Sequence, residues 1–427
     1  MMKPPPAPIA ALPTPNSWVR VRPSRITIDP SPHGVQGQTA AIGETVRIGD
    51  RITAGDGGSV IAPVDGTIVA GAPGRITIDT LSEYVIVAEP PHHDYLDPKT
   101  VAVKLAAIKP ADRGQWIDRI RAAGIVVDRH GCPNLFEQLR QSLTRPVDAV
   151  VCGALDADPS LPFASTLIEQ FAAELCVGLA LMARLSGAAG AIVAVDEDQR
   201  AIGLAPARHW AAATGVRIDR VANPYPQADP TLLLYTLLER RLRPNRLPTE
   251  VGVILLDAAA AIAIGALVMA DRPMTDVFIA ARDVMSQQVR RAYVPVGTDV
   301  ATALLGMGFN ATGVTLRAGA LLRDCRVAGD APIGFGELTF HVAPPEPAVN
   351  PDPCVRCGWC VEICPPRIHP AGLLDAAQRA NPRMAELHGL HACIECGLCT
   401  YVCPSKLPLL RSIRGLKLTV ADDSGPT

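Results

Sequence analysis

The chain has 427 residues, 48% of them hydrophobic, and a formal net charge of -2 at pH 7. This length predicts several domains, and so weak a net charge excludes nucleic acid as the main partner. Residues 1–15 contain one lysine and many prolines, which does not fit a secretory signal. The apolar stretches 171–195 and 258–270 are interrupted by charges or too short to cross a membrane. We therefore expect a cytoplasmic protein with no transmembrane segment of its own.

Residues 26–90 are rich in Val, Ile, Thr and Gly and contain short alternating runs, which predict a small β-sandwich or barrel. The pieces 43–49 and 62–69 resemble the repeated hammerhead of lipoyl- and biotinyl-type domains. Those domains modify a lysine, and positions 4–98 contain none. The sequence therefore excludes a swinging-arm function and favours a structural role for this region.

From residue 149 to residue 256, apolar runs alternate with helical stretches, which predicts a parallel α/β layer. Asp229 and Pro230 open one of the helices, as N-cap and first helical residue. The chain contains no G-x-G-x-x-G, so a standard dinucleotide fingerprint is missing. A smaller α+β segment follows at 276–340, where we expect Thr298 to cap a helix.

Eight of the twelve cysteines are concentrated in two runs near the C-terminus. Both runs read C-x-x-C-x-x-C-x-x-x-C-P, the spacing of bacterial two-cluster ferredoxins, in which the fourth cysteine ligates the other cluster. This crossed rule assigns Cys354, Cys357, Cys360 and Cys403 to one [4Fe-4S] cluster (cluster 1), and Cys393, Cys396, Cys399 and Cys364 to the other (cluster 2).

The alternative for paired Cys-x-x-Cys units is structural zinc, which does not need a fourth cysteine followed by proline. All-cysteine clusters favour low potentials and the transfer of single electrons. We expect Gly358 and Gly397 to let the backbone pass close to a cluster. We also expect the fourth cysteine of each run to start a helix.

Taken in order, these segments resemble the RnfC family, which forms a peripheral part of Rnf-type ferredoxin:NAD oxidoreductases and has relatives in NqrA and the cobalamin reductases. The firmest stretch is 393–409, followed by 225–227, 247–252 and 294–298. The resemblance implies a multidomain α/β and α+β chain. Its predicted parts are a proline-rich tail (1–25), a hammerhead-like β domain (26–110), a Rossmann-like α/β domain (111–249), an SLBB β-grasp-like domain (250–345) and a ferredoxin-like module with two [4Fe-4S] clusters (346–427).

The resemblance also implies a site for FMN and NADH, but the residues that would form it depart from the family pattern. The family's glycine-rich loop is represented by 124–133, where the bulky residues 128–130 occupy positions at which backbone must approach a phosphate or a flavin. The family's Gly-Gly-Pro-Met has become 317–320. We interpret these changes as loss of the flavin and NADH site. Asp156 and Asp158 are its remnant or, alternatively, ordinary residues at a helix start.

The sequence thus predicts an iron-sulfur subunit of an oxidoreductase complex, membrane-bound or soluble, that relays single electrons between a ferredoxin or flavodoxin and a partner subunit. One alternative is a flavin-containing, NADH-oxidising RnfC-type subunit, and another is a scaffold with structural clusters. The protein would be cytoplasmic or peripheral on the cytoplasmic face of the inner membrane. Six cations predict either a docking face for an acidic carrier or an ordinary solvated surface: Arg356, Arg367, Lys406, Arg411, Arg414 and Lys417.

Overall fold

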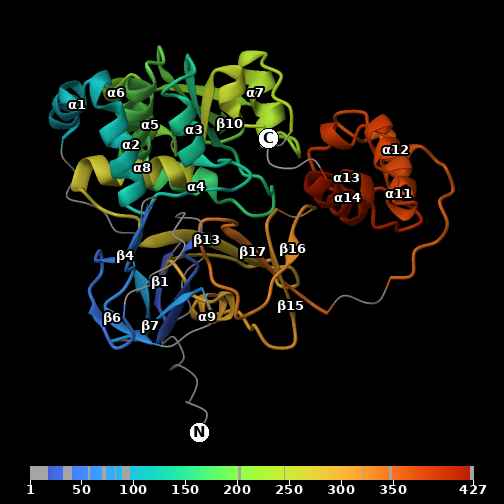
Figure 1. Cartoon of the computed structure of the whole chain (residues 1–427), viewed down its shortest axis with the longest axis horizontal. Helices are drawn as coiled ribbons and strands as arrows, with labels where there is room; N and C mark the ends of the chain where they lie inside the picture. Colours follow the sequence, from blue (N-terminus) through green and yellow to red (C-terminus); the bar gives the residue numbers. More distant parts are fainter. Residues whose placement is uncertain are drawn as a thin grey trace, which may run out of the picture.

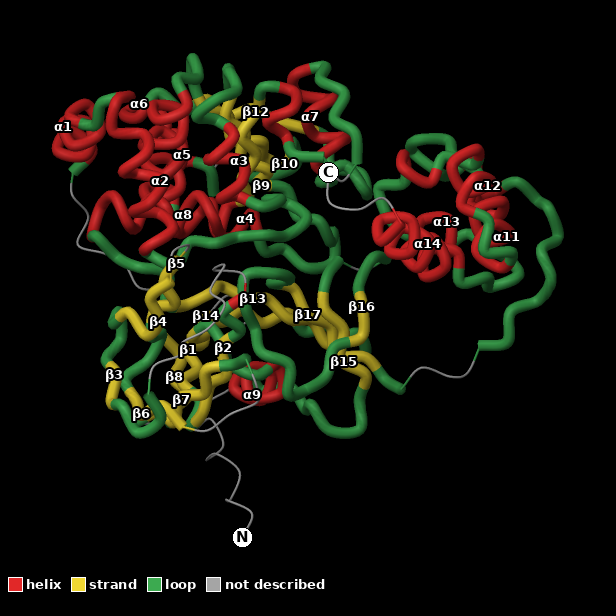
Figure 2. The backbone as a smooth tube through the Cα atoms, viewed as in Figure 1, coloured by secondary structure: helices red, strands yellow, loops and turns green. Residues whose placement is uncertain are grey.

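The chain folds into a helix-rich upper body, a β-rich lower body and a small helical module beside them (Figures 1 and 2). Most of the predicted proline-rich tail, up to residue 17, lies outside the described residues. The computed structural model describes residues 18–31, 41–55, 58–69, 74–81, 83–88, 97–200, 203–244, 246–320, 322–345 and 349–423.

A seven-stranded mixed sheet, in the order β16-β15-β17-β13-β14-β1-β8, forms the centre of the lower body. Strand β1 belongs to the predicted tail, yet it pairs in parallel with β14 and antiparallel with β8. The tail therefore ends earlier than predicted, because Trp18 is buried edge-on against Phe171 and Phe278 and holds the strand in the core. The strands are β1 (Trp18–Arg22), β8 (Tyr84–Ala88), β13 (Asp276–Asp283), β14 (Val289–Pro295), β15 (Thr315–Ala318), β16 (Cys325–Arg326) and β17 (Thr339–Ala343).

The remaining N-terminal strands form a small β unit with its own apolar core. A four-stranded antiparallel sheet, in the order β2-β7-β6-β3, is accompanied by the hairpin β4-β5. The two hammerhead-like pieces pair with each other, Thr45 opposite Thr67. The strands are β2 (Arg25–Ile28), β3 (Thr45–Val46), β4 (Arg51–Gly55), β5 (Gly58–Ile61), β6 (Gly66–Val69) and β7 (Ile76–Thr80).

The upper body contains the predicted parallel sheet, with the strand order β11-β10-β9-β12. Its last strand and the following helix α8 lie beyond residue 249, so this layer extends past its predicted boundary into the segment assigned to an SLBB-like domain. Helices α5 (Ala172–Ser186) and α8 (Ala258–Ala270) cross closely, since a Cβ on Gly265 would overlap the Glu174 carbonyl. The strands are β9 (Ala149–Ala154), β10 (Ala191–Asp196), β11 (Arg217–Val221) and β12 (Val253–Asp257).

The helices of this body bury their apolar faces in the main core, except α7, whose Leu233 and Leu234 belong to a separate apolar cluster with the strands of the parallel sheet. As predicted, Asp229 caps α7, where its carboxylate accepts from the Thr231 N–H, with Pro230 as the first helical residue. The helices are α1 (Pro98–Ala107), α2 (Arg113–Ala122), α3 (Leu135–Gln141), α4 (Ala164–Gln170), α5 (Ala172–Ser186), α6 (Ala205–Thr214), α7 (Pro230–Leu238) and α8 (Ala258–Ala270), with short 3-10 helices at Pro110–Asp112 and Pro248–Val251.

No single helix in the described part of the chain is long and apolar enough to cross a membrane. Helices α4 and α5 pass the test of length and composition only as a pair, and they are bent by 98° to each other. Phe171, at the bend, is buried in the main core.

The predicted cap at Thr298 is wrong by one residue. Helix α9 (Val300–Gly306) is capped by Asp299, whose carboxylate accepts from the Thr302 N–H at 2.8 Å. The Thr298 hydroxyl instead donates to the Pro295 carbonyl at 2.7 Å. A carboxylate competes better for the free amides of a helix start, because it is charged and has two acceptor oxygens.

The C-terminal module has a separate apolar core, built around Leu373, Leu390 and Ile413. Its third cysteines lie in the one-turn helices α10 and α13, and its fourth cysteines follow those helices. The expectation that the fourth cysteines start helices is therefore wrong, because a residue before proline is disfavoured in the α region. The helices are α10 (Trp359–Glu362), α11 (Pro370–Gln378), α12 (Pro382–Leu387), α13 (Leu398–Tyr401) and α14 (Leu409–Asp423), with a 3-10 helix at Leu390–Ala392.

Candidate iron-sulfur sites and the adjoining pocket

The two cysteine runs have the same backbone conformation. Gly358 and Gly397 precede the one-turn helices with φ of 82° and 81°, and Arg356 and Glu395 have φ of 56° and 55°. A left-handed φ near 80° is enough to explain why both positions are glycine, because only glycine adopts it at no steric cost, and no bound ligand is needed for this explanation. The repeated spacing thus encodes a repeated loop.

The thiols assigned to cluster 1 surround one cavity. Cys354, Cys357, Cys360 and Cys403 all line a cavity of about 500 Å³ at the surface of the module. Cys354 and Cys357 are exposed, and Cys360 and Cys403 are half-buried. Four thiols around one space are the donor set that a [4Fe-4S] cluster requires, so these residues fit the group.

The thiols assigned to cluster 2 are buried together. Burial raises the pKa of Cys396 to about 11 and of Cys399 to about 12. Burial is also the main reason that the pKa values of Cys364 and Cys393 are raised. A negative charge on Cys393 raises the pKa values of Cys364, Cys396 and Cys399 further. Cys364 therefore lies with the second run, as the crossed assignment requires, and bound iron would favour these thiolates against the cost of burial.

A single metal ion has no comparable site in the ranges that the structure describes. They contain no group of three or more His, Cys, Asp or Glu side chains arranged to hold one ion.

The second cysteine run is held against the rest of the molecule. The Tyr225 hydroxyl donates to the carbonyl of Cys396, and a Cβ on Gly397 would overlap the Leu322 carbonyl. Arg414 donates to the Arg323 carbonyl at 2.8 Å. In Figure 1, α13 and α14 accordingly face the upper and lower bodies, and α11 and α12 lie on the outer side. Cluster 2 is therefore the inner site and cluster 1 the outer one.

Two of the six cations expected at a docking face are used inside the module. Lys417 and Arg414 each contact the Glu395 carboxylate at 2.9 Å. Burial opposes ionisation of Glu395, but these two partners hold its pKa below the usual value. Arg414 and Lys417 therefore stabilise the second loop, and only the other four cations are exposed.

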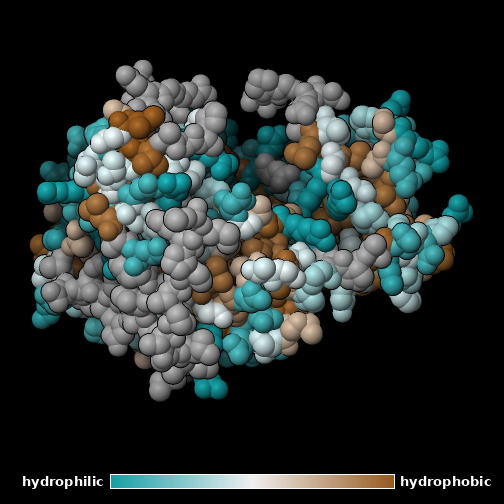
Figure 3. All heavy atoms as spheres, turned by 90° about the horizontal axis from the view of Figure 1, so that it is seen from below, coloured by the Kyte–Doolittle hydropathy of each residue, from teal (hydrophilic) through white to brown (hydrophobic). Residues whose placement is uncertain are grey.

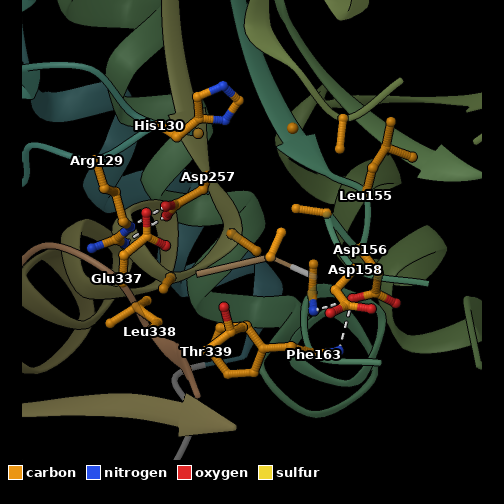
Figure 4. Close-up of a pocket in the computed structure, with 18 of the residues that line it drawn as sticks. Arg129, His130, Leu155, Asp156, Asp158, Phe163, Asp257, Glu337, Leu338 and Thr339 are labelled. Atoms are coloured by element: carbon orange, nitrogen blue, oxygen red, sulfur yellow. Dashed lines mark hydrogen bonds and ion pairs between the residues drawn. The ribbon is translucent and has the colours of Figure 1, made fainter. Parts of the chain in front are cut away.

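A pocket of about 130 Å³ lies between the ends of β9 and β12 and the segment around Arg323, whose carbonyl accepts from Arg414 of the module. Asp156 and Asp158 lie on one of its walls (Figure 4). The Asp156 carboxylate accepts from the N–H groups of Phe163 and Ala164 at the start of α4. Burial raises the pKa of Asp156. Its geometry is that of a helix-start residue, the alternative that the sequence left open.

Asp158 is fully buried beside a histidine. Its carboxylate lies 3.2 Å from His341 Nε2 and accepts from the Ser160 hydroxyl. Burial opposes ionisation, but the bonds from His341 and Ser160 lower the pKa of Asp158. Both acids of the predicted remnant site thus have partners within the protein.

The opposite wall is closed by an ion pair that the sequence did not indicate. Arg129 makes a two-armed contact with Asp257, and its third nitrogen donates to the Phe335 carbonyl at 3.0 Å (Figure 4). His130 lies beside it and contacts Asp229 at 2.8 Å. Pockets that bind a ligand as large as a flavin generally exceed about 300 Å³. The residues present therefore do not fit a flavin in this arrangement.

Comparisons with known proteins give two domain matches. Residues 131–266 match the model of the Nuo51 FMN-binding domain, and residues 353–407 match the model of the 4Fe-4S dicluster domain. The second match confirms the prediction of two [4Fe-4S] clusters. The first covers the fold around the pocket, and it is compatible with FMN.

The chain is also similar to curated proteins over most of its length. It is 24% identical to the RnfC component of the ion-translocating oxidoreductase complex of Serratia proteamaculans over 389 residues, 89% of this chain and 54% of that one. It is also 24% identical to the same component of Yersinia pseudotuberculosis over 392 residues, which are 88% of this chain and 55% of that one. The chain spans about half the length of these relatives. An NAD+-reducing [NiFe]-hydrogenase structure in the air-oxidized state covers 78% of this chain and 60% of its own, with 15% identity and a TM-score of 0.48.

Proposed function

We propose that this chain, a homologue of the RnfC component of ion-translocating oxidoreductase complexes, is an electron-transfer subunit in which cluster 2 is the inner and cluster 1 the outer site. The resemblance to the RnfC family expected from the sequence is confirmed by the curated relatives. The observation that carries the proposal is the cavity lined by Cys354, Cys357, Cys360 and Cys403. When bound, the two clusters supply one-electron carriers of low potential.

The cysteines act as ligands in the crossed sets predicted from their spacing. Burial keeps water from the four thiols of cluster 2. Glu395, fixed by Lys417 and Arg414, holds the second loop in place. Tyr225 holds the Cys396 carbonyl, so that the inner site keeps a fixed position beside the pocket.

We also propose the partners and the location of the chain. The outer site exchanges electrons with a ferredoxin or flavodoxin, and other subunits of the complex cover the remaining surface. The chain would act in the cytoplasm or at the cytoplasmic face of the inner membrane. We also propose the SLBB-like identity of the segment from β13 to β17.

The second candidate is an NADH-oxidising flavoprotein. The match of residues 131–266 to an FMN-binding domain favours it, as does the position of the pocket beside cluster 2. The Arg129–Asp257 pair and the small volume of the pocket oppose it. A scaffold with structural clusters, the third hypothesis, would have clusters that cannot be reduced and reoxidised.

Purification without oxygen, followed by iron, sulfide and flavin analysis, separates these functions. For the relay, we expect about eight iron per chain, no flavin, and absorbance that dithionite bleaches and NADH does not. Stoichiometric flavin together with bleaching by NADH would establish the second candidate. Clusters that do not respond to dithionite would contradict both and favour the scaffold.

A further inference from the structure

Large apolar side chains are exposed in the first cysteine run and on the adjoining helix α13, and one of them, Val355, lines the cavity of cluster 1. The exposed fractions are 65% for Val355, 53% for Trp359, 40% for Ile363 and 73% for Tyr401. Val355 and Trp359 flank Cys357 in the loop, and α10, which carries Trp359, packs against α13, which carries Tyr401. We call these four residues the outer face. Figure 3 shows hydrophobic atoms at the surface of the module, between hydrophilic ones.

The matching positions of the second run are covered. Ile394 corresponds to Val355 and is only 6% exposed, and Leu398 and Val402, which correspond to Trp359 and Ile363, are half-buried. The second loop is the one that Tyr225 and Leu322 hold against the body. The loop of the first three cysteines therefore forms an internal interface in the second run and lies open in the first, and Tyr401, which follows that loop in the second run, is exposed. Exposed apolar patches of this kind indicate an interaction surface.

The exposed charges in and directly beside the two cysteine runs are mostly positive. Four exposed cations, Arg356, Arg367, Lys406 and Arg411, form no ion pair within the described ranges. The loop and α10 contribute two exposed acids, Asp352 and Glu362. These four cations and two acids sum to a positive charge in and beside the cysteine runs, whereas the net charge of the whole chain is -2. Such a surface attracts an acidic partner and repels a basic one.

We propose that the outer face is the docking site of an acidic one-electron carrier protein. This inference rests on the proposed function, since it names the partner of cluster 1. An apolar centre with a cationic rim brings the carrier over the exposed Cys354 and Cys357. A bound and reduced cluster 1, held by the four thiols of the cavity, would give one electron to the oxidised carrier and so reduce it by one electron.

The test uses holoprotein reduced with dithionite, freed of excess reductant and mixed with oxidised flavodoxin, an acidic carrier. We expect the rate to fall as salt is added. The double variant Arg356→Glu/Arg367→Glu should lower it about ten-fold at low salt and raise the rate with cytochrome c, a basic acceptor. Glu395 has the same φ in the second loop as Arg356, so the first substitution suits the backbone. Arg208→Glu, an exposed arginine on α6, is the matched control and should change neither rate.

A second variant tests the apolar centre. Trp359→Ala/Tyr401→Ala should slow flavodoxin reduction and leave oxidation by ferricyanide unchanged, because a small oxidant needs no docking face. Flavodoxin rates that neither variant alters, with iron content and ferricyanide oxidation intact, would overturn the proposal. Failure of the proposed function itself would look different, because the clusters would then be absent or unreduced before any carrier is added.

Discussion

The two cysteine runs have the same spacing and the same backbone conformation, but their surroundings in the molecule differ. Both have the same cysteine spacing, the same left-handed glycine and the same backbone angles. One loop is buried against Tyr225 and Leu322, and the other is open to solvent. Local sequence thus determines how a cluster is held, and the remote contacts of the loop determine with what it can exchange electrons.

Substitutions of the cysteine ligands should have the largest effect, because they change the iron content of the protein. Under the crossed assignment, Cys364→Ala/Cys399→Ala removes cluster 2 alone, so iron falls from about eight to about four per chain. Cys360→Ala/Cys364→Ala removes a ligand from each cluster and should leave almost no iron. Iron is measured on the monodisperse fraction from gel filtration, with Cys325→Ala as the control. Half the iron in the second variant would show that each run holds its own cluster.

Gly358 and Gly397 have nearly the same φ, so alanine at each position shows how the surroundings of the two loops affect stability. Gly358→Ala meets open space and should cost only the left-handed strain, about 1–2 kcal/mol. Gly397→Ala adds the overlap with the Leu322 carbonyl, so its cost should exceed that of Gly358→Ala by about 1–3 kcal/mol. Urea titration followed by cluster absorbance measures both, and limited proteolysis reports whether the module has separated from the body. Equal losses would mean that the contact with Leu322 does not hold the second loop.

Much of this arrangement could be predicted, and the part that could not depends on distant residues. The spacing predicted that Cys403 of the second run joins Cys354, Cys357 and Cys360 as a cluster ligand, and the structure brings these four thiols to one cavity. The alternation of apolar and helical stretches predicted the parallel sheet of the upper body. The contact of Tyr225 with the second loop carries no local signal, because it joins residues far apart in the chain.

The contacts that shape the pocket were likewise not predictable from local sequence. Bulky residues in its first loop suggested that a flavin site was lost, but not that Arg129 would pair with Asp257 and close the space. Asp156 and Asp158 were inferred from a family pattern, which is silent on the partners that occupy their oxygens. Strand β1 was missed because prolines surround a five-residue alternation whose partner strand, β14, lies far along the chain.

The residue between the first two cysteines of each run allows the finest comparison. Glu395 is half-buried and bonded to Lys417 and Arg414, whereas its counterpart Arg356 is exposed and has no ion pair among the described residues. Glu395→Gln should destabilise the module by about 1–3 kcal/mol at pH 7, since it removes the charged partner of Arg414 and Lys417 and leaves Lys417 bonded only to the Cys393 carbonyl. Arg356→Gln should change stability by less than about 0.5 kcal/mol. Urea titration of the holoprotein measures both variants, and equal stability would mean that the ion pairs do not fix the inner loop.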